Sequence, residues 1–467
     1  MLFHSFGFFL FFWIVFGVYW RLREHERRMR WLLAASIIFY GLWSPWFVLL
    51  IAFTAGADYL IALQIEAAAQ ERARRAWLVL SLVVSLSLLA FFKYAHFMLE
   101  AGSGLLALFG FGFVPPAFDL VLPLGISFYT FETISYVVDV YRGRVRAERN
   151  VFHYALYIMF FPHLIAGPIV RPSQFLWQIR TRKHFDWARL QFGAQLFLRG
   201  LLKKAVFADR LALVVDPIFR APGEFSSATL WLGTVAYAVQ VYCDFAGYTD
   251  MARGVAQAFG FKLPINFDRP YLAASVGEFW RRWHITLSSW VRDYLYIPLG
   301  GSRDVAWKTY RNLIFSMVIL GLWHGAGWNF IVFGLYHGVL LSLERAFPLP
   351  AWTQRGLPRL ARIGVTFTVV CFGLVIFRNP SLAGGAIMLQ RMLQPLAGAT
   401  LPLSVVTITL VIIGLIFAGH VFGRARLWRD LAGRVPAPLV GVAMACLFLL
   451  IQLLIPEDGG TFIYFQF

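Results

Sequence analysis

The chain has 467 residues, of which 59% are hydrophobic, 18% are aromatic and only 14% are charged, and this composition excludes an ordinary soluble globular protein. The formal net charge of +18 would suggest a nucleic-acid partner for a soluble protein, but here the Arg and Lys residues lie in short connections between apolar runs. The positive-inside rule produces that distribution, so we expect no nucleic-acid partner. The recurring apolar runs predict an all-α, polytopic membrane protein in contact with lipid.

In the first half of the chain, each basic cluster is expected to lie in the cytoplasm. A helix at about 6–20 precedes "RLREHERRMR" and is expected to be retained, with its N-terminus outside. A hairpin broken at "WSPW" follows, and then helices at about 77–97 and 122–138. The run "YIMFFPHLIAGPIVRP" is interrupted by proline and glycine, which favours a re-entrant or interfacial segment over a full crossing.

The second half begins with residues 171–204, which carry eight basic residues against one Asp and predict an amphipathic cytoplasmic layer. Crossings are expected at about 207–218 and 230–248, and "FWRRWHITLSSWVRDYLYIPLGGS" is too charged to span, which predicts a helix pair in the inner leaflet. The apolar run 313–343 is broken by "HGAG", where two short helices are expected to meet. The remaining crossings, which bring the total to about twelve, are expected at 365–376, 403–418 and 439–454.

His324, in "VILGLWHGAGWNF", is an ionisable side chain inside an apolar run. Such a group is costly to keep there, so it indicates a functional site. A structural histidine bonded to a helix carbonyl is the alternative. Gly325 and Gly327 favour the functional interpretation, because they remove side chains beside the ring and would leave room for a ligand.

A second polar cluster, "EFWRRWHITLSSWVRDYLYIP", holds His284 together with Trp280, Arg281, Arg282 and Trp283. One interpretation is an interfacial helix with an aromatic belt and arginines that reach the interface. The other is a site where rings and guanidinium groups bind the phosphate of an anionic cofactor.

Carboxylates at membrane depth form the third and fourth clusters. "VYCDFAGYTDMARG" holds Asp244 and Asp250, which either pair with arginines or shape a polar tunnel, and Glu132 lies in "LPLGISFYTFETISYVVDVYRG". The three cysteines lie singly, and no Walker loop, GxSxG or HExxH motif is present, so no metal and no permanently bound cofactor is expected. A histidine without a sequence-adjacent nucleophile suggests a general base acting on a hydroxyl.

These motifs, with "FFPHLIAGPIVRPSQF", resemble the membrane-bound O-acyltransferase superfamily over nearly the whole chain, and within it the bacterial alginate O-acetyltransferase branch. That branch is related to the membrane protein that carries D-alanine out to teichoic acids. The resemblance places the membrane histidine of the family at His324 and its second histidine at His284. It implies tilted helices around a thinned centre, with a central cytoplasmic funnel and an outer cavity meeting near His324. "HGAGWNF" departs from the "HGASW" of alginate enzymes, which leaves the polymer open.

The resemblance implies a bacterial inner-membrane O-acyltransferase that moves an acyl group, with acetyl expected, from a cytoplasmic thioester to an exported polysaccharide such as alginate. The donor would be acetyl-CoA or an acylated carrier protein, and a periplasmic or membrane-anchored SGNH-type acetyltransferase would be a partner. His324 would be the general base, and His284 would help to position the donor. The alternatives are D-alanyl or other acyl transfer to a different envelope polymer, lipid acylation, and a secondary transporter with a proton-relay histidine. The residues expected to bind donor or substrate are Trp280, Arg281, Arg282, Trp283, Asp244, Tyr248, Trp323 and Asn329.

The C-terminal tail at 457–467, within "PEDGGTFIYFQF", follows a membrane domain expected at 1–456. The preceding connection "GRARLWRDLAGR" is basic, so the last crossing should deliver the tail, and with it the C-terminus, to the outer face. The tail resembles the aromatic C-terminal motif of the small partner in teichoic-acid D-alanylation, where a tyrosine carries the acyl group. Tyr464 would then be a transient acyl acceptor, and an interfacial aromatic anchor is the alternative.

Overall fold

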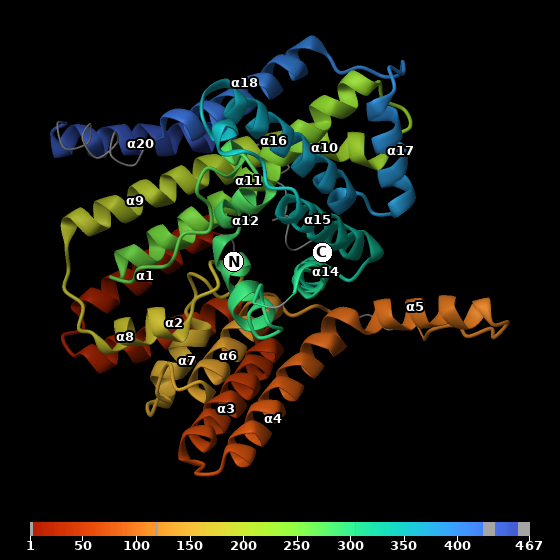
Figure 1. Cartoon of the computed structure of the whole chain (residues 1–467). Coiled ribbons are helices and arrows are strands. Elements are labelled where there is room, and N and C mark those ends of the chain that lie inside the picture. Colours follow the sequence, from red (N-terminus) through yellow and green to blue (C-terminus); the bar gives the residue numbers. More distant parts are fainter. Residues whose placement is uncertain (1–2, 117–119, 304, 424–434, 456–467) are drawn as a thin grey trace. The chain divides into compact units, whose positions relative to one another are not determined.

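The computed structural model describes residues 3–116, 120–303, 305–423 and 435–455. Their regular structure is helical, apart from an isolated parallel bridge between Phe225 and Ala399, which confirms the all-α prediction. Figure 1 labels the helices in chain order. The chain divides into two compact units. Unit 1 comprises Met1–Phe197 and Met251–Pro264, and unit 2 comprises Leu198–Asp250 and Ile265–Phe467.

Unit 1 contains the helices of the first part of the chain. The first expected helix is confirmed, because Ser5 caps α1 by accepting the Phe8 N–H at 3.3 Å and the helix runs to Arg21. The expected break at "WSPW" is also present, since Pro45 starts α3. The helices are α1 (Phe6–Arg21), α2 (His25–Gly41), α3 (Pro45–Ala67), α4 (Glu71–Leu89), η1 (Ala90–Tyr94), α5 (Ala95–Leu108), α6 (Ile126–Tyr141), α7 (Val151–Met159), α8 (Pro172–Arg180) and most of α9 (Trp187–Leu201).

The interrupted run after α7 is a buried, non-helical segment at 160–170. Backbone groups that leave a helix inside a membrane protein need other partners, and side chains supply them here. Ser36 accepts the Phe161 N–H at 3.1 Å, and Glu132 accepts the Val170 N–H at 2.8 Å. Gly125 begins α6 with φ of +77°, and a Cβ there would lie 2.4 Å from the Leu164 carbonyl oxygen. The interruption of the helical pattern is therefore confirmed.

Unit 2 contains most of the helices of the second part of the chain. The expected helix pair after residue 275 is present as two short helices, α12 and α13. The elements are η2 (Leu202–Ala208), α10 (Asp209–Arg220), most of α11 (Ser227–Ala258), η3 (Pro270–Leu272), α12 (Val276–Arg282), α13 (Ile285–Val291), η4 (Arg292–Tyr296), α14 (Ala306–His324), α15 (Trp328–Ala346), η5 (Ala351–Gln354), α16 (Gly356–Arg378), α17 (Leu382–Leu393), α18 (Leu403–Phe422) and α20 (Ala437–Leu454).

Four helical stretches among the described residues are long and apolar enough to cross a membrane, fewer than the twelve crossings expected from the sequence. They are Pro45–Ala67, Glu71–Leu108, Gly356–Arg378 and Leu403–Phe422. The expected crossing at 207–218 falls largely on α10, whose 12 residues rise only about 18 Å against a hydrocarbon core of about 30 Å. The expected crossing at 122–138 falls on α6, where almost every side chain is buried inside unit 1. Apolar character at α6 therefore reflects internal packing.

The "HGAG" break joins α14 to α15, as expected, although each helix is 19 residues long and not short. Both helices contain glycines where they meet. A Cβ at Gly321 would lie 2.1 Å from the Phe330 carbonyl oxygen, and one at Gly334 would lie 2.3 Å from the Met317 carbonyl oxygen. The two backbones therefore approach too closely for any side chain at these positions.

Candidate active site

His284 and His324 lie side by side in unit 2, with ring centroids 6.4 Å apart. His324 is the last residue of α14 and is 5% exposed, while His284 joins α12 to α13 and is fully buried. Forty residues separate them in the sequence, so the fold creates this pair. The two histidines that the family resemblance selected thus form one buried cluster.

The backbone at His284 is left-handed, with φ of 43° and ψ of 54°. A bulky residue rarely adopts this conformation, and such strain is found preferentially at functional sites. Two hydrogen bonds cap the start of α12: Ser275 accepts the Glu278 N–H at 3.1 Å, and the Glu278 carboxylate accepts the Ala274 N–H at 2.8 Å. His284 lies outside the four long apolar stretches, and burial, reinforced by nearby His324, holds the pKa of its imidazole well below its usual value.

Aromatic rings enclose the two histidines. Phe245 lies 4.6 Å from His284 between centroids, Trp323 lies 5.8 Å from His284, and Phe377 lies 5.3 Å from His324. The space beside Gly325 differs from the expectation, because a Cβ there would lie 2.1 Å from the Phe330 ring. A packed ring fills that side of the site, so Gly325 serves close packing and does not open room for a ligand.

The tryptophans expected to bind the donor are buried. Trp280 is 6% exposed and its Nε1–H donates to His337 Nδ1 at 3.4 Å, while Trp283, also 6% exposed, stacks on Phe279 at 5.5 Å. Of the two arginines between them, Arg282 donates to Glu278 at 2.8 Å, and Arg281 has an exposed side chain.

The carboxylates of α11 are paired, as one of the two interpretations predicted. Arg199 donates two hydrogen bonds to Asp250, at 3.0 and 2.8 Å, and Lys203 donates a third at 2.9 Å. Lys204 lies between Asp244, at 2.8 Å, and Asp209, at 2.7 Å, and all three side chains are at most 4% exposed. Charges this deeply buried stabilise the fold only as pairs.

Two more residues that were expected to bind donor or substrate, Tyr248 and Asn329, also lie within unit 2. Tyr248, also on α11, is 5% exposed. Asn329 is the second residue of α15 and donates its side-chain N–H groups to the carbonyl oxygens of Phe377 and Asn379, both at 3.2 Å. These bonds satisfy carbonyl groups that the end of α16 leaves open. Asn329 thereby connects α15 to the end of α16, whose Phe377 ring lies against His324.

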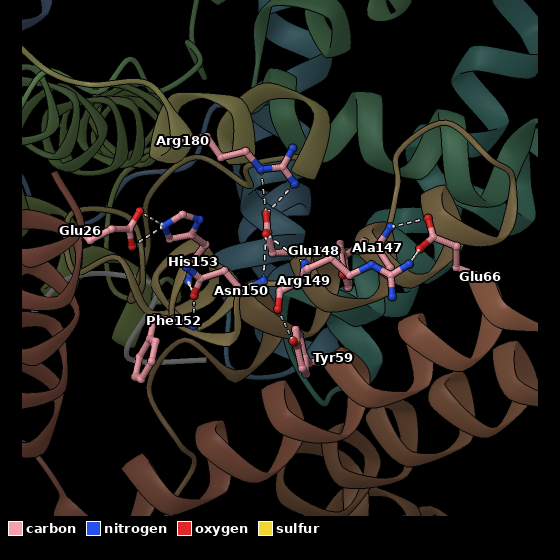
Figure 2. A network of polar contacts seen from close by, with 11 residues as sticks. Glu26, Tyr59, Glu66, Ala147, Glu148, Arg149, Asn150, Phe152, His153 and Arg180 are labelled. Atoms are coloured by element: carbon pink, nitrogen blue, oxygen red, sulfur yellow. Dashed lines mark hydrogen bonds and ion pairs between the residues drawn. The ribbon is translucent and has the colours of Figure 1, made fainter.

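Other basic residues of the 171–204 layer also have partners within the fold. Figure 2 shows a polar network of unit 1 in which Arg180 donates two hydrogen bonds to Glu148, at 3.0 and 2.6 Å. Glu148 in turn accepts the Arg149 and Asn150 N–H groups, at 3.0 and 3.1 Å. Lys183 is 8% exposed, with its ammonium 4.8 Å from the centre of the Phe261 ring. Much of the expected cytoplasmic layer therefore contributes to internal structure.

Two of the buried histidines outside the expected set of site residues lie in largely apolar segments. His337, in "GLYHG", is 1% exposed and carries the bond from Trp280. His163, in "FFPHLIAGP", lies 3.2 Å from Glu132 in unit 1, and both are nearly fully buried. The signal that selected His324, an ionisable group in an apolar run, would have found both. Tyr464 and the tail at 457–467 lie outside the described residues.

The model of the membrane-bound O-acyltransferase family matches residues 32–355, so the chain belongs to that family and is a multi-pass membrane acyltransferase.

Three relatives indicate where the chain falls within the family. It is 43% identical over 376 residues to the probable alginate O-acetylase AlgI of Pseudomonas aeruginosa, which covers 80% of this chain and 71% of that protein. It is 37% identical over 393 residues to the peptidoglycan O-acetyltransferase of Helicobacter pylori, covering 78% of this chain and 73% of that protein. The teichoic acid D-alanyltransferase of Bacillus subtilis is 29% identical over 291 residues, covering 56% of this chain and 70% of that protein.

Proposed function

We propose that the chain transfers an acetyl group from a cytoplasmic thioester for the O-acetylation of an exported polysaccharide such as alginate. The observation that carries this proposal is the buried pair of His284 and His324 at the "HGAG" break of an O-acyltransferase. The similarity to probable alginate O-acetylases, at 43% identity over 80% of the chain, supports the polymer class and the acetyl group.

His324 acts as the general base in this proposal. One imidazole nitrogen takes the proton of the acceptor hydroxyl, and the hydroxyl oxygen bonds to the thioester carbonyl carbon. The carbon–sulfur bond then breaks, and the thiol leaves with the proton that the imidazolium returns. A positioned base of this kind contributes about 10²- to 10⁴-fold in rate. The surrounding rings of Trp323 and Phe377 limit access of water, which would otherwise hydrolyse the thioester.

His284 positions the donor next to this base. Its left-handed backbone fixes the direction of its ring. The ring centroids of His284 and His324 are 6.4 Å apart, so both rings can face the same reacting group. The exposed Arg281, on the same short helix, provides a cation for donor phosphates. The other expected binding residues support this centre through the internal contacts described above.

The path of the acyl group follows from membrane topology. The thioester, carried by coenzyme A or by an acyl carrier protein, enters through a funnel on the basic cytoplasmic face of the bacterial inner membrane. In this proposal both termini of the membrane domain 1–456 lie outside, and Tyr464 of the tail accepts the acyl group as a tyrosyl ester. The pKa of a phenol, about 10, lies between that of a thiol, about 8.5, and that of a far less acidic alkyl hydroxyl. Transfer from the thioester to the tyrosyl ester, and from there to a serine ester, is therefore favourable. A serine of an SGNH-type partner then delivers the group to the polymer.

The ester found on the exported polymer shows which acyl group the chain transfers. The chain is expressed in a host that exports alginate and has an SGNH-type partner but lacks its own membrane-bound O-acetylase, and esters on the washed polymer are released by alkali. Acetate released in excess of the empty-vector control is the expected result. D-Alanine released from the cell envelope would favour the second candidate, which the similarity to the teichoic acid D-alanyltransferase supports. Neither ester, with the protein present in the membrane, would contradict the proposal.

A further inference from the structure

Helix α12, which ends two residues before His284, is attached to α15 by two polar contacts. The Trp280 Nε1–H donates to His337 Nδ1 at 3.4 Å, and the Gly277 N–H donates to the Glu344 carboxylate at 3.0 Å. His337 and Glu344 are seven residues apart, so they lie on the same face of α15 two turns from each other. One face of α15 therefore holds both ends of a helix that is only seven residues long.

The order of these contacts sets the direction of α12. Along α12 the contacts run from Gly277 to Trp280, while along α15 they run back from Glu344 to His337. The two helices therefore run in opposite directions, and the end of α12 that carries His284 points toward the beginning of α15. That beginning is where the "HGAG" break places His324.

The same helix fixes the other histidine. Glycines 321 and 334 hold α14 and α15 in direct backbone contact, which fixes the end of α14 against the first turns of α15. The Phe333 ring of α15 lies 6.3 Å from His324, 4.7 Å from His337 and 6.3 Å from Trp280, between centroids. Helix α15 is therefore the common support of both histidines.

From these contacts we infer that His337 is a positioning residue for the acyl transfer, with Glu344 in a lesser role. Through Trp280, His337 fixes the rotation of α12 and so sets the separation of His284 from His324. The bond from Trp280 to His337 is buried, because His337 is 1% exposed, so it constrains α12 more than the second contact does. Glu344, which makes the second contact, lies on an exposed turn of α15. This inference rests on the proposed roles of His284 and His324.

The chemistry of the bond explains why a histidine occupies this position. The neutral ring accepts at Nδ1 from the indole, which places its proton on Nε2. A Cβ at Gly373 of α16 would lie 2.7 Å from that Nε2, so the ring is also confined by a third helix. An apolar ring of similar size would keep the packing but would leave the Trp280 N–H without an acceptor at this position.

Three variants of the full chain test the inference. His337→Phe removes the acceptor, His337→Asn keeps an oxygen near the Nδ1 position, and the double variant Trp280→Phe/His337→Phe removes donor and acceptor together. The matched control is His420→Phe, since His420 is a buried histidine of the same unit whose Nδ1 lies 2.9 Å from the Ile416 carbonyl oxygen on its own helix. Each protein is purified in detergent, its melting temperature is measured, and kcat and donor KM are determined. Acetyl-CoA and an acetylated acyl carrier protein are tried in turn, and the donor that the wild type uses serves for all variants.

A displacement of about 1 Å at a reaction centre lowers the rate by up to about 100-fold. We expect His337→Phe to lower kcat by about 10- to 100-fold with donor KM within about twofold, and His337→Asn to stay within about threefold of wild type. The double variant should melt above His337→Phe, since no indole N–H is left unpaired, but should keep the low kcat. His420→Phe should keep the wild-type kcat.

A wild-type kcat in His337→Phe would overturn the inference, as would equal losses in His337→Phe and His337→Asn. Recovery of kcat together with stability in the double variant would also overturn it, because the bond would then matter only for folding. If His337→Phe cannot be purified, the double variant decides. His324→Ala in the same series separates the two proposals: wild-type kcat in that variant contradicts the proposed function, whereas inactivity there with normal His337→Phe contradicts only the positioning role.

Discussion

Substitution of Gly321 by alanine tests whether the contact between α14 and α15 sets the geometry of the site. A Cβ at this position would lie 2.1 Å from the Phe330 carbonyl oxygen and 3.0 Å from the Gly334 nitrogen. The Phe330 oxygen belongs to the backbone of α15 and cannot rotate away. To reach 3.0 Å the two helices must separate by 3.0 − 2.1 = 0.9 Å. Gly321 is three residues before His324 on α14, so the displacement would also move the proposed base.

The expected cost has two parts. Overpacking of this size destabilises a protein by about 1–3 kcal/mol. A displacement near 1 Å at a reaction centre lowers the rate by about 100-fold. Gly321→Ala should therefore melt at a lower temperature than wild type, and the folded fraction should transfer acyl groups about 100-fold more slowly.

Gly414→Ala is the matched control, because Gly414 lies in the helix α18 and nothing lies within 4 Å of its Cβ position. Alanine is a better helix former than glycine by about 1 kcal/mol, so this variant should be as stable as wild type or slightly more so. Both proteins are assayed for melting temperature and for kcat. If Gly321→Ala matches Gly414→Ala in both measurements, the close contact of α14 and α15 does not control the site.

Three other substitutions have defined outcomes. Lys204→Met leaves buried carboxylates without their cation, at a cost of about 3–5 kcal/mol, so the yield of monodisperse protein should fall. Lys204→Met/Asp244→Asn should recover part of that yield, and an unchanged yield in Lys204→Met would refute the role of Lys204. Glu132→Leu removes the acceptor of the Val170 N–H, at a cost of about 1–3 kcal/mol, and should melt below Glu132→Gln, which keeps an oxygen there; equal melting temperatures would argue against that bond. Tyr464→Phe keeps the aromatic ring and deletes the hydroxyl, so polymer acetylation should stop if Tyr464 carries the acyl group; wild-type acetylation would make it an anchor.

Local signals in the sequence were sufficient for many helix boundaries. The end of α14 at His324 and the start of α15 at Trp328 follow from the glycines of "HGAG". The sequence predicted a crossing at α6, but hydropathy does not distinguish lipid from protein interior and so could not show that this helix is buried within unit 1. Helix α17 was missed because its 12 residues are too few to span, although Ser381 caps it by accepting the Gly384 N–H.

The arrangement of the site depended on contacts that no local pattern contains. The family resemblance selected His284 and His324, but their proximity depends on the packing of α12 against α15. One of the two interpretations of Asp244 was a pair with an arginine, and its partner is instead Lys204, which is 40 residues away and reaches α11 from the π-helical turn of η2. Pairings of this kind follow from tertiary structure.

The general-base role of His324 is the central claim, and one measurement tests it most directly. His324→Ala is compared with wild type for the initial rate of acyl transfer in membranes that contain equal amounts of each protein. Loss of the base should lower the rate by at least about 100-fold, while abundance and membrane insertion stay unchanged. A rate equal to that of wild type in His324→Ala would contradict the assignment of His324 as the catalytic base.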